Sequence, residues 1–237
     1  MEYAIIAAGQ GSRLVADGVE TSKPLLPLNG VAMIDRLIAI FLDNNAESIS
    51  IIINEEMVDV RTHLENLKLP VPLHLLIKTT PDSLHSFYEL ASLIPNRQKL
   101  CLTTIDPIFS PLEFSAYIRS FESDEKHDAL MAVTDYIDDE KPLYVKTNDD
   151  LTITDFLDES YEGFRYVSGG VYCLNSKVIS LLQTAIESGV SRMRNFQRQI
   201  VYSGLKVHAY PFSKIIDVDH ASDILKAELF LKRVENK

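Results

Sequence analysis

The stretch "AIIAAGQGSRL" (residues 4–14) runs from a short apolar strand directly into two closely spaced glycines, a serine and an arginine. Glycines allow backbone N–H groups to approach a phosphate closely, and a neighbouring cation neutralises the phosphate charge. A dinucleotide-binding fingerprint needs a third glycine at position 14, where Leu14 stands, and a GxxxxGK[ST] loop needs a Gly-Lys pair, which this stretch lacks. We therefore predict a phosphate-binding loop of a third type, with a plain strand-to-loop turn as the alternative.

The 237-residue chain around this loop is acidic, with a formal net charge of −11. Binding to a nucleic-acid backbone needs a basic face, whereas a few cations and backbone N–H groups suffice for one nucleotide. The composition, 46% hydrophobic and 24% charged, is that of an ordinary globular protein. No apolar run reaches the length of a membrane span, and the first residues lack a signal-peptide pattern. We therefore expect a cytoplasmic protein without a nucleic-acid or membrane partner.

The first half of the chain alternates apolar runs typical of strands with amphipathic segments typical of helices. Strands are predicted at 3–8, 48–54, 72–78 and 99–105, and helices at 32–45, 58–67 and 81–94. A strand-helix alternation of this kind predicts a parallel sheet with helices on both faces.

The second half has a more antiparallel pattern. Helices are predicted at 111–122, 176–189 and 192–202, with strands at 128–136, 142–157 (two strands), 164–175 and 206–212, and a short strand from 214 that turns into a C-terminal helix. We predict one domain, residues 1–237, with a nucleotide-binding half at about 1–107 and an acceptor-binding half at about 108–237.

Several motifs together resemble one enzyme family. "AAGQGSRL" (7–14) followed by "SKPLLPLNG" (22–30) is similar to the signature of the nucleotidyltransferases, a family that includes sugar-1-phosphate nucleotidylyltransferases, small cytidylyltransferases and molybdopterin guanylyltransferases. "KTTPDSLHSF" (78–87), "CLTTID" (101–106) and "IIDVDHASDILKAELFL" (215–231) match further family segments in the same order. The resemblance implies a Rossmann-like, GT-A-like fold: a three-layer α/β/α arrangement around a mostly parallel mixed sheet.

The resemblance also implies a role for each matching residue. Arg13 and Lys23 would bind the triphosphate and the leaving pyrophosphate as catalytic cations. The other implied site residues are Ala7, Ala8, Gly9, Gly11, Ser12, Thr80 and Ser83 for the nucleotide, Gly169 and Gly170 for the acceptor, and Asp106, Asp217 and Asp219 for Mg²⁺. The residues themselves support the metal assignment, because Asp106 ends an apolar strand and Asp217 and Asp219 alternate along one, so that their carboxylates share a side.

Some of these residues have structural alternatives. Asp106 before Pro107 could simply form a turn, and Asp219 could cap the last helix. Thr80 could cap a helix, and Gly169 with Gly170 could form a strand bulge.

The function implied by the resemblance is an in-line attack by an acceptor phosphate on the α-phosphate of a nucleoside triphosphate, with release of pyrophosphate and with Mg²⁺ as cofactor. A sugar 1-phosphate is the favoured acceptor. A cytidylyltransferase acting on phosphocholine or a polyol phosphate is the nearest alternative, and a nucleotide-binding protein without turnover is another. Ser22, Thr79 and Ile105 depart from the family pattern. Thr79 and Ile105 narrow the access to the backbone near the base and ribose, so the nucleotide preference stays open.

Overall fold

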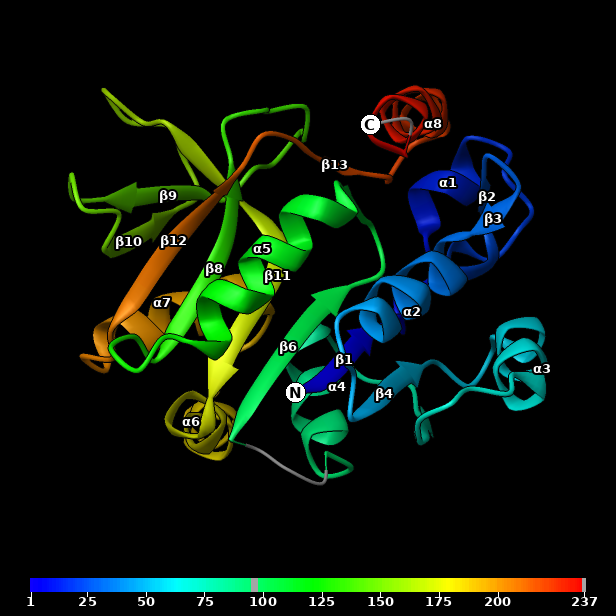
Figure 1. The fold of residues 1–237 in the computed structure, drawn as a ribbon, viewed down its shortest axis with the longest axis horizontal. Helices are drawn as coiled ribbons and strands as arrows, with labels where there is room; N and C mark the ends of the chain where they lie inside the picture. The colour runs from blue at the N-terminus through cyan, green and yellow to red at the C-terminus, as the bar shows by residue number, and fades with distance from the viewer. Residues whose placement is uncertain (95–97, 236–237) are drawn as a thin grey trace.

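A computed structural model describes residues 1–94 and 98–235, and its centre is a nine-stranded mixed sheet (Figure 1). The strands are β1 (Glu2–Ile6), β4 (Ser48–Ile53), β5 (Leu73–Ile77), β6 (Lys99–Thr104), β8 (Ala129–Thr134), β9 (Tyr144–Thr147), β10 (Ile153–Leu157), β11 (Tyr166–Asn175) and β12 (Val207–Phe212). They run in the order β10-β9-β11-β6-β1-β4-β5, and β8 pairs with both β11 and β12.

The N-terminal half of this sheet is parallel. β1 pairs in parallel with β4 and β6, and β4 pairs in parallel with β5. β11 is antiparallel to its neighbours β6, β8 and β9. Since parallel strands have their carboxyl ends at one edge, the segments after Ile6, Ile53 and Thr104 meet there.

Helices cover both faces of the sheet, which confirms the predicted three layers. One face carries α2 (Met33–Asp43), α3 (Val58–Asn66), α5 (Pro111–Glu122) and α8 (Ala221–Glu235), and the other carries α4 (Ser83–Ala91), α6 (Ser176–Glu187) and α7 (Met193–Tyr202). Each face of the sheet has its own hydrophobic core, and β1 contributes to both because successive side chains of a strand point to opposite faces. Tyr3 stacks on Phe41 of α2 with the ring centroids 4.5 Å apart, whereas Ala4 belongs to the core around α4.

A small two-stranded pair joins the end of the chain to the end of β6. β7 (Pro107–Phe109) pairs antiparallel with β13 (Ile215–Asp217), so Asp217 lies opposite Pro107. The Val218 N–H donates to the carbonyl of Asp106 at 3.2 Å. Sequence patterns did not reveal β7, which has three residues, nor the other short elements: α1 (Ser12–Ala16), the 3₁₀ helix η1 (Lys23–Leu25), β2 (Pro27–Leu28) and β3 (Val31–Ala32).

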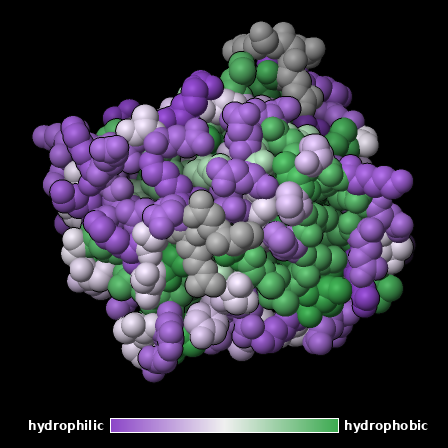
Figure 2. All heavy atoms as spheres, turned by 60° about the horizontal axis from the view of Figure 1, so that its bottom comes forward, coloured by the Kyte–Doolittle hydropathy of each residue, from purple (hydrophilic) through white to green (hydrophobic). Residues whose placement is uncertain are grey.

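The edge of the sheet at β5 is apolar. Figure 2 shows a broad hydrophobic area on a surface that is otherwise largely hydrophilic. All five residues of β5 are partly exposed. Within residues 1–94 and 98–235, no helix combines the length and the apolar character that crossing a bilayer requires.

The predicted helices and strands all have counterparts in the structure, with ends that differ by a few residues. The largest difference is at the helix predicted over 81–94, because α4 begins only after Asp82 and ends at Ala91.

Candidate active site

A cavity of about 650 Å³ opens at the carboxyl edge of the parallel strands. It is lined by the loop 8–13 after β1, Asn54 after β4, residues 79–83 at the start of α4, residues 104–106 at the end of β6, and also by Ile6, Lys23, Ser86 and Asp219. Such an edge is where open α/β sheets bind ligands. The cavity has the size of a small-molecule site.

Most of the predicted nucleotide-binding residues line this cavity: Ala8, Gly9, Gly11, Ser12, Thr80 and Ser83, together with the cations Arg13 and Lys23. Ala7 does not, because it is fully buried and its N–H donates to the carbonyl of Ile52. Gly11 has a left-handed φ of 61°, and an added Cβ would lie 3.2 Å from the Cβ of Lys23. This position therefore requires glycine for its backbone conformation and for the close approach of Lys23.

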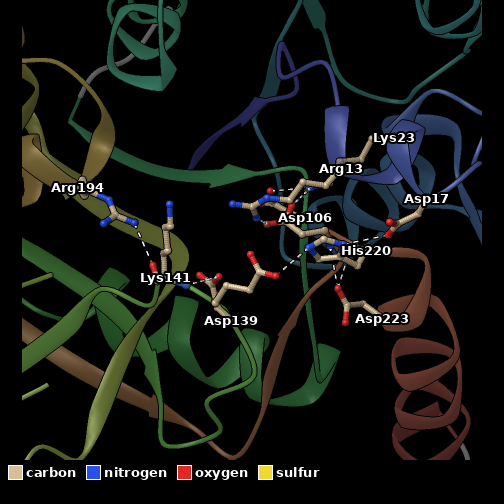
Figure 3. Close-up of polar contacts among 11 residues, drawn as sticks. Arg13, Asp17, Lys23, Asp106, Asp139, Lys141, Arg194, His220 and Asp223 are labelled. Atoms are coloured by element: carbon tan, nitrogen blue, oxygen red, sulfur yellow. Dashed lines mark hydrogen bonds and ion pairs between the residues drawn. The ribbon is translucent and has the colours of Figure 1, made fainter. Parts of the chain in front are cut away.

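A cluster of alternating charges lines the cavity (Figure 3). The Lys23 ammonium is buried and donates to Asp106 at 2.9 Å and to Asp219 at 2.7 Å. The second oxygen of Asp219 accepts from Arg13 at 2.6 Å. The structure thus joins four predicted site residues, which come from the first 25 residues, the end of β6 and the segment before α8.

The charges shift each other's proton affinities. Although burial lowers it, the charges of Asp106 and Asp219 raise the pKa of Lys23 above its usual range. Although burial raises it, the charge of Lys23 and a hydrogen bond from Thr104 hold the pKa of Asp106 below its usual range. Lys23 is therefore a fixed cation and Asp106 a fixed anion at neutral pH.

Asp217 lies beside this cluster rather than in it. Its Oδ1 atom is buried without a hydrogen-bond partner among the described residues. Burial, and then the charges of Asp106 and Asp219, raise the pKa of Asp217 well above its usual range. Asp217 and Asp219 both line an adjoining cavity of about 280 Å³, in agreement with the prediction that their carboxylates share a side.

The helix-cap alternative for Asp219 is wrong. Its carboxylate oxygens bind Lys23 and Arg13 instead of the start of α8. Asp223 in the first turn of that helix accepts the N–H groups of Asp219 and His220. Capping and charge binding are thus divided between different carboxylates.

The carboxylates fit a divalent cation that also binds phosphates. Among the described residues, no group of three His, Cys, Asp or Glu side chains has the arrangement of a metal site. Mg²⁺, however, is usually bound by one or two protein carboxylates together with water and substrate phosphates. Three aspartates (Asp106, Asp217 and Asp219) lie near the two cations Arg13 and Lys23. The Oδ1 atom of Asp217 has no hydrogen-bond partner among the described residues, so it is available to a cation.

The wall before α4 is a network of hydroxyl groups and one carboxylate. Asp82 is the N-cap of α4 and accepts the N–H groups of Leu84 and His85, so the helix-cap alternative for Thr80 is wrong. The Thr80 hydroxyl instead lies 2.6 Å from the hydroxyl of Ser86, and the Ser83 hydroxyl accepts the N–H of Met193 at 3.0 Å.

Asn54 and Asp82 are among the polar residues of the cavity that sequence reasoning missed. Buried Asn54 donates from Nδ2 to the carbonyl of Ala8 at 3.1 Å and so holds the loop after β1. Asp82 also accepts the N–H of Arg192 at 2.9 Å, which ties the two halves of the chain together. Both had a signal: Asn54 ends an apolar strand, as Asp106 does, and Asp82 precedes a helix.

The predicted acceptor glycines lie outside the large cavity. The strand register shifts between Ser168 and Tyr172, which confirms the bulge alternative, and Gly170 has a φ of 72°. An added Cβ at Gly170 would lie 2.9 Å from the hydroxyl of Thr104, and one at Gly169 would lie 2.2 Å from the side chain of Ile215. Both glycines thus have a packing role, and their contact with an acceptor stays a prediction.

Comparison with known families decides the class. The nucleotidyl transferase family matches residues 3–233. The chain belongs to this family. This match and the solved structures below confirm the predicted enzyme class, nucleotidyltransferase, and the predicted α/β fold. A comparison with curated proteins gives no match.

Solved nucleotidyltransferase structures share the fold. The inositol-1-phosphate CTP transferase from T. maritima is 20% identical, with a TM-score of 0.82 over 99% of this chain and 96% of that one. A protein described as a glucose-1-phosphate thymidylyltransferase, from Bacillus anthracis and in complex with a sucrose, is 18% identical, with a TM-score of 0.83 over 97% of this chain and 94% of that one.

Proposed function

We propose that this nucleotidyltransferase transfers a nucleoside monophosphate from a nucleoside triphosphate to the phosphate of a sugar 1-phosphate or a related polyol phosphate. An oxygen of the acceptor phosphate attacks the α-phosphorus, the bond between the α-phosphorus and the bridging oxygen breaks, and pyrophosphate leaves. The products are a nucleoside-diphosphate derivative and pyrophosphate.

The charge cluster that lines the cavity is the observation that carries this proposal. In-line displacement at phosphorus depends on positioning and on neutralisation of charge. Arg13 and Lys23 are held next to the loop after β1, so they can neutralise the β- and γ-phosphates and the leaving pyrophosphate. The loop and the segment 79–83 would hold the nucleotide itself.

Mg²⁺ is part of the proposal, with Asp106 and Asp217 as ligands and Asp219 as a third carboxylate beside them. When bound, the ion would polarise the α-phosphate and neutralise negative charge on the triphosphate. The residues of the chain orient the phosphates around it: Lys23 fixes the carboxylates of Asp106 and Asp219, and Arg13 fixes the second oxygen of Asp219.

A phosphorylated ring as acceptor is supported by the solved structures, since two proteins of this fold are described as acting on inositol 1-phosphate and on glucose 1-phosphate. We also propose that the enzyme acts in the cytoplasm, where nucleoside triphosphates are supplied, and that it has no nucleic-acid partner.

Pyrophosphate release tests the proposal. ATP, CTP, GTP, UTP and dTTP are each combined with glucose 1-phosphate, inositol 1-phosphate or phosphocholine, with Mg²⁺ or with EDTA. We expect release with at least one sugar or polyol phosphate, loss of release in EDTA, and none from Asp106→Ala, which should keep the circular dichroism spectrum of the wild type. Clear nucleotide binding without release from any pair would indicate a binding protein instead, and release with phosphocholine alone would overturn the acceptor class.

A further inference from the structure

The strand β5 forms one edge of the main sheet. Among the strands of the described residues it pairs with β4 alone, in parallel and without a shift of register. A strand in this position carries a row of backbone N–H and C=O groups to which another chain can bind. The chemistry of this edge therefore decides whether it is protected from such binding or open to it.

The hydrogen bonds between β4 and β5 show which backbone groups are open. The carbonyl of Pro72 accepts the N–H of Ile49 at 3.0 Å, and the N–H of Lys78 donates to the carbonyl of Ile53 at 2.9 Å. Along a strand, every second residue directs its N–H and C=O to the same neighbour. Residues 72, 74, 76 and 78 therefore face β4, and residues 73, 75 and 77 direct their backbone groups outward.

The side chains of this edge are apolar on both faces of the sheet. Leu73, Leu75 and Ile77 pack against the core on the face of α2, and Leu76 packs against the core on the face of α4. All of them stay partly exposed. Further partly exposed apolar residues precede the strand: Leu67, Leu69 and Val71. Apolar surface thus accompanies the open backbone groups along the whole edge.

The other edges of the sheet are protected. β10 contains Asp155, has a shift in its register with β9, and is covered by Arg198 of α7, which donates to the carbonyl of Phe156 at 2.8 Å. β12 contains Pro211, which lacks an N–H. Charges, shifts of register and prolines are the devices that prevent edge strands from binding other chains. β5, with the sequence LHLLI, contains neither a proline nor an acidic or basic residue other than His74.

The distribution of charge favours a second copy of this chain at the β5 edge. With a formal net charge of −11, two copies repel each other over most of their surfaces. Residues 66–81, however, contain no Asp or Glu and only two basic residues besides His74, Lys68 and Lys78. Lys78 is already paired with Glu89 at 2.7 Å. Two copies can therefore approach each other here without bringing acidic residues of this stretch together.

We propose that β5 binds β5 of a second copy of this chain, antiparallel across a two-fold axis, so that the two sheets become one. A two-fold interface brings the same surface of both copies together, and a strand of five residues pairs fully when the axis passes Leu75. Leu75 then lies opposite Leu75 of the other copy, and Leu73 lies opposite Ile77. All of these residues direct their backbone groups outward, so each pair can exchange both of its N–H···O bonds.

Sedimentation over a range of protein concentrations tests the proposal. We expect the wild type to have the mass of two chains at high concentration and to dissociate on dilution. Leu75→Lys would bring two ammonium groups together at the axis, so it should raise the Kd of the dimer at least about tenfold. The matched control is Thr154→Lys, which adds the same charge at an exposed position of β10 and should leave the Kd unchanged. Both variants should keep the circular dichroism spectrum of the wild type.

Amide hydrogen exchange of the wild type tests the same contact without a substitution, so the proposal stays testable if Leu75→Lys fails to fold. The N–H groups of Leu73, Leu75 and Ile77 should exchange more slowly as the dimer forms. Those of His74 and Leu76, which face β4, should exchange slowly at every concentration.

Four outcomes would overturn the proposal. The first is the mass of one chain at every concentration, and the second is a dimer in which the outward N–H groups exchange fast. The third is a dimer that Thr154→Lys weakens as much as Leu75→Lys does. The last is slow exchange of the outward groups in a monomer, which would place another segment of the same chain on this edge.

Discussion

The ammonium of Lys23 lies 2.7 Å from the carboxylate of Asp219, which is 196 positions away in the chain. Lys23 is nearly fully buried and also binds Asp106, so one side chain joins η1, the end of β6 and the segment before α8. The cluster therefore forms only in the folded chain, and we expect its charges to serve stability as well as the proposed phosphate binding.

Removing the Lys23 ammonium tests this double role. Lys23→Met keeps most of the side-chain volume but leaves Asp106 and Asp219 without their shared cation. We expect the free energy of unfolding to fall by about 2 kcal/mol, less than for a fully buried pair because both carboxylates are about 30% exposed. Pyrophosphate release should fall about 10²-fold or more. Denaturant titration and the release assay measure the two effects.

Lys78→Met is the matched control for Lys23→Met. Lys78 pairs with Glu89 at 2.7 Å, but its side chain is 47% exposed. Surface pairs of this kind contribute less than about 1 kcal/mol. Equal stability losses in the two variants would show that the position of Lys23 has no special energetic role.

The two glycines of the loop after β1 should respond differently to alanine. Gly11→Ala places a side chain at a φ of 61° and 3.2 Å from Lys23, so it should cost about 1–2 kcal/mol of stability. Gly9→Ala meets no atom within 4 Å, so its stability should change by less than about 0.5 kcal/mol. Its Cβ would lie where the phosphates approach, so its KM for the triphosphate should rise. Thermal unfolding and kinetics together distinguish the two positions, and a Gly9→Ala enzyme with normal kinetics would place the phosphates elsewhere.

Asp82 should make stability depend on pH. Burial raises its pKa, but hydrogen bonds from the N–H of Arg192, from His85 and from the N–H of Leu84 outweigh burial and hold the pKa below its usual range. The stabilisation is therefore fully present above the pKa of an unfolded aspartate, about 3.9, and is lost as the pH falls through the lower value of the folded protein. Asp82→Asn keeps a capping oxygen but loses the charge, so we expect it to be about 1 kcal/mol less stable than the wild type at pH 7.

The difference between wild type and Asp82→Asn should shrink as the pH falls below about 4. Urea unfolding at a series of pH values measures it, with Asp149→Asn, a change in an exposed turn, as control. A difference that stays constant down to the acid transition would rule out a contribution from the charge.

Local patterns explain how much of the fold could be predicted from the sequence. Strand and helix periodicity is a property of neighbouring residues, so the order of the main elements and the three layers followed from it. The pairing of β7 with β13 could not be predicted in this way, since each strand has only three residues and depends on the other. That pair is what brings Asp217 opposite Pro107.

The candidate site divides in the same way. Arg13, Lys23 and Asp106 belong to motifs with a local signature, and the structure brings them together as the motifs imply. Asp82 had a weaker signature, because an aspartate before a helix predicts only a cap, and its other partner, the N–H of Arg192, is 110 positions away.

Replacing Asp217 with asparagine should stabilise the protein while it weakens the response to Mg²⁺. Asp217 is half-buried near Asp106 and Asp219, and its Oδ1 atom is buried without a hydrogen-bond partner in the described part of the chain. Its charge therefore opposes folding in the absence of a cation. We expect Asp217→Asn to raise the free energy of unfolding by about 1 kcal/mol in EDTA, because residues kept for function often lower stability and replacing them removes this cost. Added Mg²⁺ with a triphosphate should raise the melting temperature of the wild type more than that of the variant. Asp150→Asn, at an exposed turn, is the control. A variant that is no more stable in EDTA, or that responds to Mg²⁺ as the wild type does, would remove Asp217 from the metal site.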